Sequence, residues 1–279
     1  MTQDLTPKIQ KKPHLLIILI WIFVALCLLG SIGKFLFDRY LQNALLEASS
    51  DGDDGRLRSL LRMGANPNFV LTDGAFTLYS PLMRAADNKK WSTVHLLLSA
   101  GAKPTMPGEG LSPLPFAVQA KNLNIVIELL KSGADPNGST GGMSTNLSQA
   151  VRNSDLPIVT ALLDAGADPN SCSDTGLGTE SNRLEIVKLM LAYGANVNIH
   201  ARSTGLRIYH EGGYTPLMFA VKAGNKEITR FLLAHGASPK VKWTPMNPER
   251  RDIQTPLRTA EQNKRLDLAN LLRQAGATE

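Results

Sequence analysis

The chain has 279 residues, 43% of them hydrophobic and 19% charged, with a formal net charge of +6. This composition excludes a wholly disordered chain, because it supplies enough apolar side chains for a substantial core. The positive charge is local: residues 199–265 hold 12 basic and 5 acidic side chains, whereas residues 38–198 hold 13 and 16. Two cysteines, Cys27 and Cys172, are too few for a disulfide framework or a four-cysteine metal site.

The amino-terminal segment has the pattern of a membrane anchor. Residues 15–33 carry no charged side chain, and the apolar stretch continues to Phe37 because Lys34 is long enough to snorkel. At roughly 1.5 Å per residue, such a helix spans a hydrocarbon core of about 30 Å. We therefore predict a basic cytoplasmic tail at residues 1–14 and a transmembrane signal-anchor helix at residues 15–37, which attaches the protein to the membrane.

The flanking charges predict the orientation of this anchor. Residues 8–12 hold three lysines, and Lys34 and Arg39 follow the apolar run, so the positive-inside rule favours a single-pass protein with its amino-terminus inside. The rest of the chain is then extracytoplasmic, and periplasmic in a Gram-negative bacterium. Two alternatives remain open: the rest lies on the cytoplasmic side, or the segment is a signal cleaved near Ser31 and Gly33 and the protein is secreted to the periplasm.

From residue 38 onward one pattern recurs. A first position, usually proline, is followed 20 residues later by glycine, and a leucine and an alanine stand one and four residues after the first position. A fixed interval of this kind indicates a helical hairpin used repeatedly, since a unit too small to bury its own apolar face must stack on its neighbours. The pairs are Pro81 and Gly101, Pro113 and Gly133, Asn146 and Gly166, Pro216 and Gly236, Pro256 and Gly276, with Ala44 and Gly64 as a weaker pair.

Several short motifs resemble those of ankyrin repeats: Thr215-Pro216-Leu217, Thr255-Pro256-Leu257, Gly133-Ala-Asp-Pro-Asn137 and Gly166-Ala-Asp-Pro-Asn170. Threonine or serine caps the first helix, proline suits its first turn, and glycine ends the second helix. The resemblance implies an all-α solenoid of about seven helical hairpins with finger loops, preceded by the transmembrane helix. The ankyrin repeat domain is expected at residues 38–279, with repeats at about 40–68, 77–105, 109–137, 142–170, 171–198, 212–240 and 252–279.

Two repeats depart from the pattern. Residues 173–181 contain two glycines where the first helix of the fifth repeat is expected, and each glycine disfavours a helix by roughly 1 kcal/mol. Because the second helix of that repeat is still expected at Leu184–Ala192, we predict a weak point in the stack there. In the seventh repeat Arg273 replaces the leucine of the other repeats, as suits a carboxy-terminal cap.

The resemblance implies a non-catalytic module that binds a protein with its concave face and fingers. The long fingers at residues 199–213 and 240–254 collect arginine and aromatic residues, the types that dominate interface energetics. The candidate protein-binding residues are Phe76, Tyr79, Arg152, Arg207, Tyr209, Tyr214, Trp243, Arg250 and Arg251. By position in the repeat, the resemblance adds Thr77, Asp87, Asn88, Glu109, Leu111, Gln119, Ser144, Asn153, Glu211, Lys222, Asp252, Gln254 and Gln262.

The sequence carries no phosphate-binding glycine loop, nucleophile elbow or metal-binding pattern. We therefore expect no enzymatic activity, cofactor, metal, nucleic acid or small-molecule substrate. The expected partner is a protein with an acidic surface, because the two long fingers are basic. Two alternatives remain open: a structural or assembly scaffold of an envelope complex, and an exported immunity factor that neutralises a toxin, as some exported bacterial proteins that resemble this chain are.

Overall fold

The computed structural model describes residues 13–72, 78–105, 112–139, 144–171, 183–200, 213–243 and 253–278, with the backbone alone at residues 13–29, 71–72 and 78–79. These residues form thirteen helices and one pair of short strands. The helices are α1 (Pro13–Asp51), α2 (Asp54–Arg62), α3 (Pro81–Asp87), α4 (Trp91–Ser99), α5 (Leu114–Gln119), α6 (Leu123–Lys131), α7 (Asn146–Arg152), α8 (Leu156–Asp164), α9 (Leu184–Ala192), α10 (Pro216–Ala223), α11 (Lys226–Ala234), α12 (Pro256–Gln262) and α13 (Leu266–Gln274). The strands are β1 (Leu71–Thr72) and β2 (Leu78–Tyr79).

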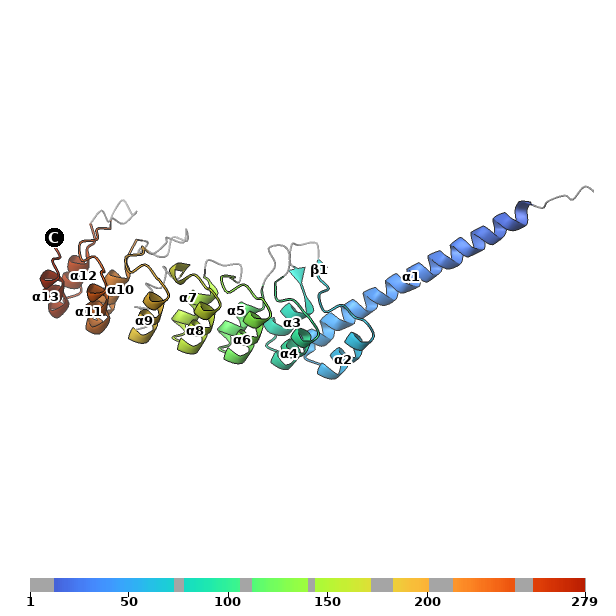
Figure 1. Cartoon of the computed structure of the whole chain (residues 1–279), viewed down its shortest axis with the longest axis horizontal. Helices are drawn as coiled ribbons and strands as arrows, with labels where there is room; N and C mark the ends of the chain where they lie inside the picture. Colours follow the sequence, from blue (N-terminus) through green and yellow to red (C-terminus); the bar gives the residue numbers. More distant parts are fainter. Residues whose placement is uncertain are drawn as a thin grey trace, which may run out of the picture.

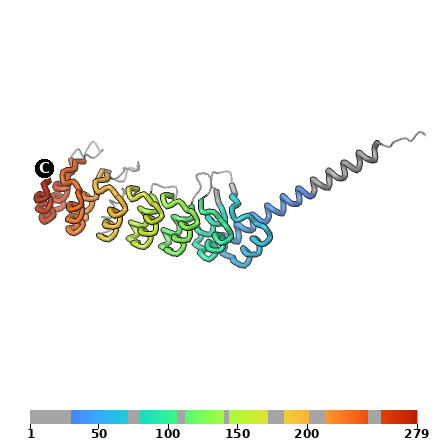
Figure 2. The backbone as a smooth tube through the Cα atoms, viewed as in Figure 1, coloured from blue at the N-terminus to red at the C-terminus, as the bar shows by residue number. Residues whose placement is uncertain are grey.

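The helices form hairpins that stack in chain order into an elongated array, from which α1 projects at one end (Figure 1). An inner row contains α1, α3, α5, α7, α10 and α12, and an outer row contains α2, α4, α6, α8, α9, α11 and α13. The backbone trace shows the same order along the array (Figure 2). About seven hairpins are expected from the sequence; the described residues contain six complete ones, and α9 stands without a described first helix.

The core lies between the two rows of helices. The leucine and alanine of each repeat face it, and the alanines have no exposed surface, so that inner and outer helices approach closely. This arrangement explains the fixed spacing of the sequence pattern, because a larger side chain at the alanine position would separate the helices. The buried residues are Leu45, Leu82, Leu114, Leu147, Leu217 and Leu257, with Ala48, Ala85, Ala117, Ala150, Ala220 and Ala260.

The first helices begin largely as the capping residues predict. The hydroxyl oxygens of Ser80, Thr145 and Thr255 each accept a hydrogen bond from the backbone N–H three residues later, at 3.1 Å. Thr215 departs from this pattern, since its side chain makes no capping bond and its Oγ1 atom is buried without a partner among the described residues. Proline at the next position and the packing of α10 define that helix start instead.

Asparagine side chains join successive repeats along the array. Oδ1 of Asn137 accepts a hydrogen bond from the backbone N–H of Asp168 at 2.8 Å, and its Nδ2 donates to the carbonyl of Gly166 at 3.4 Å. The Asp135 carboxylate receives the N–H of Asn137 at 2.9 Å and shapes this turn. The last residue of the Gly-Ala-Asp-Pro-Asn motif therefore bonds one repeat to the next, and Asn68, Asn170 and Asn198 do the same.

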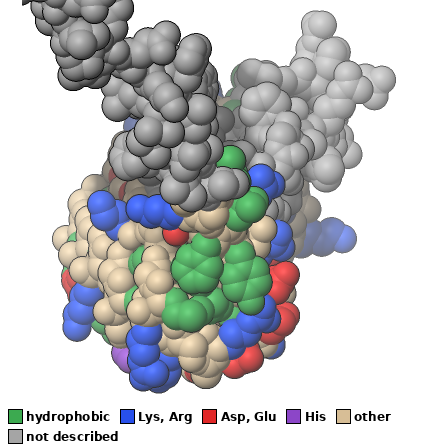
Figure 3. Space-filling view, turned by 90° about the vertical axis from the view of Figure 1, so that its right-hand side faces the viewer, with side chains coloured by type: hydrophobic (Ala, Val, Ile, Leu, Met, Phe, Trp, Pro, Cys, Tyr) green, Lys and Arg blue, Asp and Glu red, His purple; other side chains and the backbone are tan. Residues whose placement is uncertain are grey.

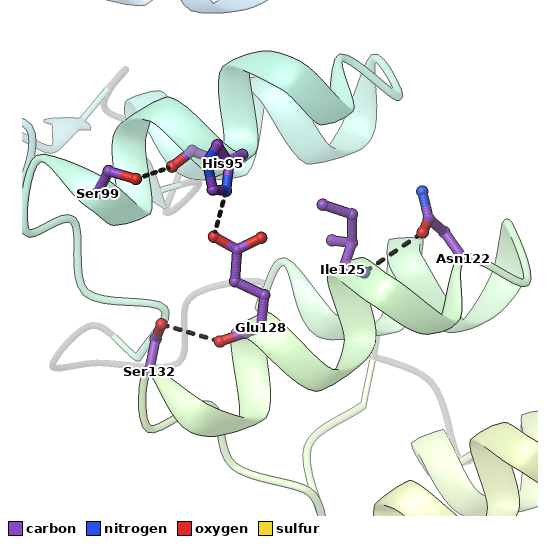
Figure 4. Close-up of polar contacts among 6 residues, drawn as sticks. All are labelled: His95, Ser99, Asn122, Ile125, Glu128 and Ser132. Atoms are coloured by element: carbon purple, nitrogen blue, oxygen red, sulfur yellow. Dashed lines mark hydrogen bonds and ion pairs between the residues drawn. The ribbon is translucent and has the colours of Figure 1, made fainter.

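Polar contacts also link the outer helices on the surface. Nδ1 of His95 on α4 lies 2.7 Å from Oε1 of Glu128 on α6 (Figure 4). At the start of α6, Oδ1 of Asn122 accepts the backbone N–H of Ile125 at 3.3 Å. The exposed His95 side chain makes this pair a minor contribution to stability, because solvent screens a surface ion pair.

The fifth repeat divides the core into two clusters. Ile186 and Met190 of α9 belong to the cluster that begins with α1, whereas Val187 belongs to the cluster of α10 to α13. The predicted helix at Leu184–Ala192 is confirmed. The predicted loss of the first helix falls on residues 172–182, which lie outside the described residues. Among the described residues, α9 is the helix that connects the two clusters.

Helix α1 runs without interruption from Pro13 to Asp51 and becomes the first inner helix of the array. Leu41, Ala44, Leu45 and Ala48 are buried, while residues 30–40 are exposed all around the helix. In the portion of the chain that the structure describes, no helix is both long enough and apolar enough to cross a membrane. The side chains of residues 13–29 lie outside that portion, so the anchor at residues 15–37 stays a prediction.

Candidate protein-binding surface

The predicted binding residues fall into two groups. Phe76, Arg207, Tyr209, Arg250 and Arg251 lie outside the described residues, as do Thr77, Glu109, Leu111, Glu211 and Asp252. Tyr79 lies in β2, where the backbone alone is described. The remaining candidates have described side chains. They lie on the inner helices or at the residues where a finger leaves or rejoins the array.

The exposed candidates form a row along the inner helices. Asp87, Gln119, Arg152, Lys222 and Gln262 are exposed and lie in the last turns of α3, α5, α7, α10 and α12. Since these helices repeat the same orientation, their last turns present side chains at regular intervals on one face. Asn88 is also exposed, and Ser144, Asn153 and Gln254 are half-buried at the edges of this row.

The fingers leave the array as short β-structures on one edge, where β1 is labelled in Figure 1. In the first finger β1 and β2 pair antiparallel, with Leu71 opposite Tyr79. A single bridge joins Ser139 to Thr145 and another joins Trp243 to Gln254. The strand pair and these two bridges join the described ends of three fingers.

Tyr214 is a support for the last fingers, with only 9% of its surface exposed. Its ring meets the Phe219 ring edge-on at 5.6 Å and the Trp243 ring at 5.0 Å, measured between centroids. Burial raises the pKa of the Tyr214 hydroxyl, and a hydrogen bond with Thr259 lowers it to a smaller extent. The sequence suggests Tyr214 as a contact for a partner, but the structure shows its ring packed between the sixth and seventh repeats.

Trp243 lies where the described ends of the two long fingers meet, at residues 200, 213, 243 and 254, which we call the shared root. Its backbone exchanges hydrogen bonds of 2.9 and 2.7 Å with Gln254, across the base of the last finger. Its half-buried ring covers Gly213, where an added Cβ would lie 2.0 Å from the indole. Nδ1 of His200 lies 2.9 Å from the Gly213 carbonyl oxygen and closes the base of the preceding finger. The described ends of both fingers therefore meet at one place.

Sequence reasoning missed this shared root. Trp243 and Gly213 are 30 positions apart and occupy no repeated place in the pattern, so periodicity gives no signal for their contact. The available hint is the doublet Gly212-Gly213 directly before Tyr214, because glycine is favoured where an aromatic ring approaches the backbone closely. The positive φ of Gly213, 106°, is a second requirement for glycine there.

Exposed basic side chains occur at both ends of the inner helices of the last two repeats. Lys222, Arg258, Lys264 and Arg265 lie on or beside α10 and α12, and Lys240 and Lys242 lead into the last finger. On the outer face, Lys226 bonds Asp267 at 3.3 Å, and this bond is the main cause of the lowered pKa of the Asp267 carboxyl. In the described ranges, no three histidine, cysteine, aspartate or glutamate side chains gather to hold a metal ion.

Stacked helical hairpins with fingers on one edge define a solenoid repeat protein, a class that uses its extended surface to bind other proteins. A family model of ankyrin repeats, spanning three copies, matches four overlapping stretches at residues 45–140, 82–173, 147–243 and 176–278. The chain therefore belongs to the ankyrin repeat family, whose members are generally non-catalytic binding scaffolds. The resemblance expected from the motifs is confirmed.

Two curated proteins share part of this array. A mouse ankyrin repeat and MYND domain-containing protein 1 is 41% identical over 71 residues, which is 25% of this chain and 8% of the mouse protein. The human protein of the same name is 43% identical over 65 residues, 23% of this chain and 7% of the human one. The chain thus matches less than a tenth of either relative's length. Both relatives are mammalian, so these matches lend no support to a bacterial source.

Proposed function

We propose that this chain is a membrane-tethered, non-catalytic module that holds a protein partner with an acidic surface. The observation that carries this proposal is the shared root of the two long fingers. The described ends of both fingers meet where Trp243 covers Gly213, and this supports the proposal that the arginines at positions 207, 250 and 251 serve one partner. A single surface with several arginines suits a carboxylate-rich partner, because guanidinium groups bind carboxylates through two parallel hydrogen bonds.

The rigid core beneath this surface favours tight binding. Tyr214, Phe219 and Met218 are buried under the root, so little side-chain freedom is lost there when a partner binds. The row of exposed residues from Asp87 to Gln262 extends the surface along the array. The partner accordingly contacts both the fingers and the inner face, as the broad surfaces of repeat proteins allow.

The tether in this proposal is the apolar first part of α1, with residues 1–14 on the cytoplasmic side and the array on the extracytoplasmic side. Its support is the uncharged run of residues 15–33 and the three lysines that precede it. We expect alkaline phosphatase fused after Glu279 to be active in a bacterial host, because this enzyme requires export. An inactive fusion, together with an active cytoplasmic reporter at the same position, would reverse the orientation.

The binding proposal is tested by removing arginines from the fingers. The triple variant Arg207→Gln, Arg250→Gln, Arg251→Gln is expected to lose at least thirtyfold in affinity for the natural partner, since replacing one anchoring arginine commonly costs about 2 kcal/mol. The measurement is quantitative capture from solubilised membranes, followed by titration of the captured protein. Trp243→Ala is unsuitable for this purpose, because the indole also supports the finger root.

A matched variant separates specific contacts from net charge. Lys131→Gln, Lys188→Gln, Arg230→Gln removes the same number of positive charges from α6, α9 and α11 on the outer face, where all three residues are exposed. This variant should keep wild-type affinity apart from a modest change in association rate. Equal losses in both triple variants would show a general charge effect and contradict a finger-borne site.

A further inference from the structure

The first repeat has an unusual exposed end. Ile32, Phe35, Leu36, Phe37 and Tyr40 of α1 are all more than half exposed, with Phe35 at 62% and Tyr40 at 61%. The space-filling view from this end shows hydrophobic side chains gathered in one area, with both basic and acidic side chains around it (Figure 3). The apolar surface surrounds much of the helix rather than one stripe, and a fluid lipid environment covers such a surface better than one protein partner would.

Helix α2 turns back toward the same end. With its amide oriented to satisfy both bonds, Gln42 of α1 donates to the carbonyl of Asn66 and accepts from its N–H, each at 3.2 Å. The turn after α2, residues 62–66, is therefore level with residue 42 of α1. Arg62 and Met63 in this turn are exposed, and Met63 exposes 52% of its surface.

The turn also differs from its counterparts along the array. The residue before the helix-ending glycine is Met63 in the first repeat and Ala100, Ser132, Ala165, Tyr193, His235 or Ala275 in the others. The residue before that is Arg62 in the first repeat and Ser99, Lys131, Asp164, Ala192, Ala234 or Gln274 in the others. Lys131 is also basic, but Ser132 follows it, so the first repeat is where a basic residue precedes a large apolar one. An apolar side chain beside a cationic one is the combination that an interfacial membrane surface requires.

We propose that the turn at residues 62–66, together with Tyr40, rests in the headgroup layer of a membrane that contains anionic lipids. This inference rests on the proposed tether. If the hydrocarbon core ends near Phe37, the step to Gln42 along the helix is roughly 7.5 Å. The headgroup layer on each side of a bilayer is roughly 5–8 Å thick, so it reaches the turn. Met63 inserts among the lipids and Arg62 contacts their phosphates.

The continuity of α1 makes this contact possible. The helix enters the array without a break, and Leu41, Ala44 and Leu45 are buried against the first hairpins. No linker separates the apolar segment from the first repeat, so the array is held at a fixed height above the bilayer.

A depth measurement tests this proposal on the full chain in vesicles of phosphatidylcholine and phosphatidylglycerol. A fluorophore is placed at Met63→Cys in a Cys27→Ser, Cys172→Ser background, and quencher lipids carry a nitroxide on the headgroup. Ala275→Cys, which occupies the same place in the seventh repeat, is the matched control. We expect loss of most of the fluorescence at position 63 and little loss at position 275. Arg62→Gln should reduce the equilibrium constant for lipid contact about fivefold, whereas Lys131→Gln, at the same place in the third repeat, should not.

The outcomes distinguish this contact from the tether. If the chain resists extraction with alkaline carbonate but position 63 is quenched no more than position 275, the tether stands and the headgroup contact is wrong. Release of the chain by carbonate would contradict both. If energy transfer between labelled copies accounts for the change at position 63, a second copy of the chain covers this end, which also overturns the proposal.

Discussion

The Met190→Ala variant is expected to unfold in two transitions. Met190 has no exposed surface, and its truncation should cost about 2–5 kcal/mol, because the cavity is only partly refilled. Met190 and Ile186 attach α9 to the cluster that begins with α1, and Val187 attaches it to the cluster of α10 to α13. When the first attachment is weakened, the two clusters should unfold at different denaturant concentrations, because repeat arrays are held together by nearest-neighbour interfaces.

Leu129→Ala is the control for this experiment. Leu129 is equally buried, but α6 lies between neighbours in a part of the array where both rows of helices are described. Its truncation should lower the free energy of unfolding by a similar amount without separating the two halves. Urea titration followed by circular dichroism distinguishes the two cases. A single transition for Met190→Ala, with the same width as that of Leu129→Ala, would show that α9 is not a weak junction.

Gly213→Ala is expected to displace the Trp243 indole and to lower the free energy of unfolding by about 2–4 kcal/mol. The left-handed backbone at Gly213 adds roughly 1 kcal/mol for any residue with a Cβ, and overpacking typically adds 1–3 kcal/mol. An added methyl group would lie 2.0 Å from the indole ring, which cannot remain in place. Because Trp243 closes the base of the last finger, this variant should also weaken partner capture.

Gly236→Ala separates strain from displacement. Gly236 has a φ of 87°, but nothing lies within 4 Å of its added Cβ, so the conformational cost alone applies there. Thermal unfolding should show a loss of about 1 kcal/mol for this control. In a Trp21→Phe, Trp91→Phe background, Trp243 emission should shift to longer wavelength in Gly213→Ala and remain unchanged in Gly236→Ala. Equal emission in both variants would contradict the packing of Trp243 on Gly213.

Much of the array could be predicted from the sequence because each repeat uses the same short-range interactions. Ser80, Thr145 and Thr255 cap helices by bonds to residues three positions away, and the buried alanines recur at one fixed spacing. The second helix of the fifth repeat was predicted at its observed bounds for the same reason. Thr215 shows the limit of this reasoning, since the motif is present but the capping bond is not.

The sequence by itself determined the family, the succession of hairpins and the uncharged run before them, because these follow from residue types at short, regular intervals. Only the tertiary structure decided that Tyr214 is buried, that Trp243 covers Gly213, and that two fingers share a root. It also decided that the turn at Met63 lies level with Gln42 of α1. Such contacts join residues that are distant in the chain and belong to no repeated pattern, so their geometry depends on how the hairpins stack.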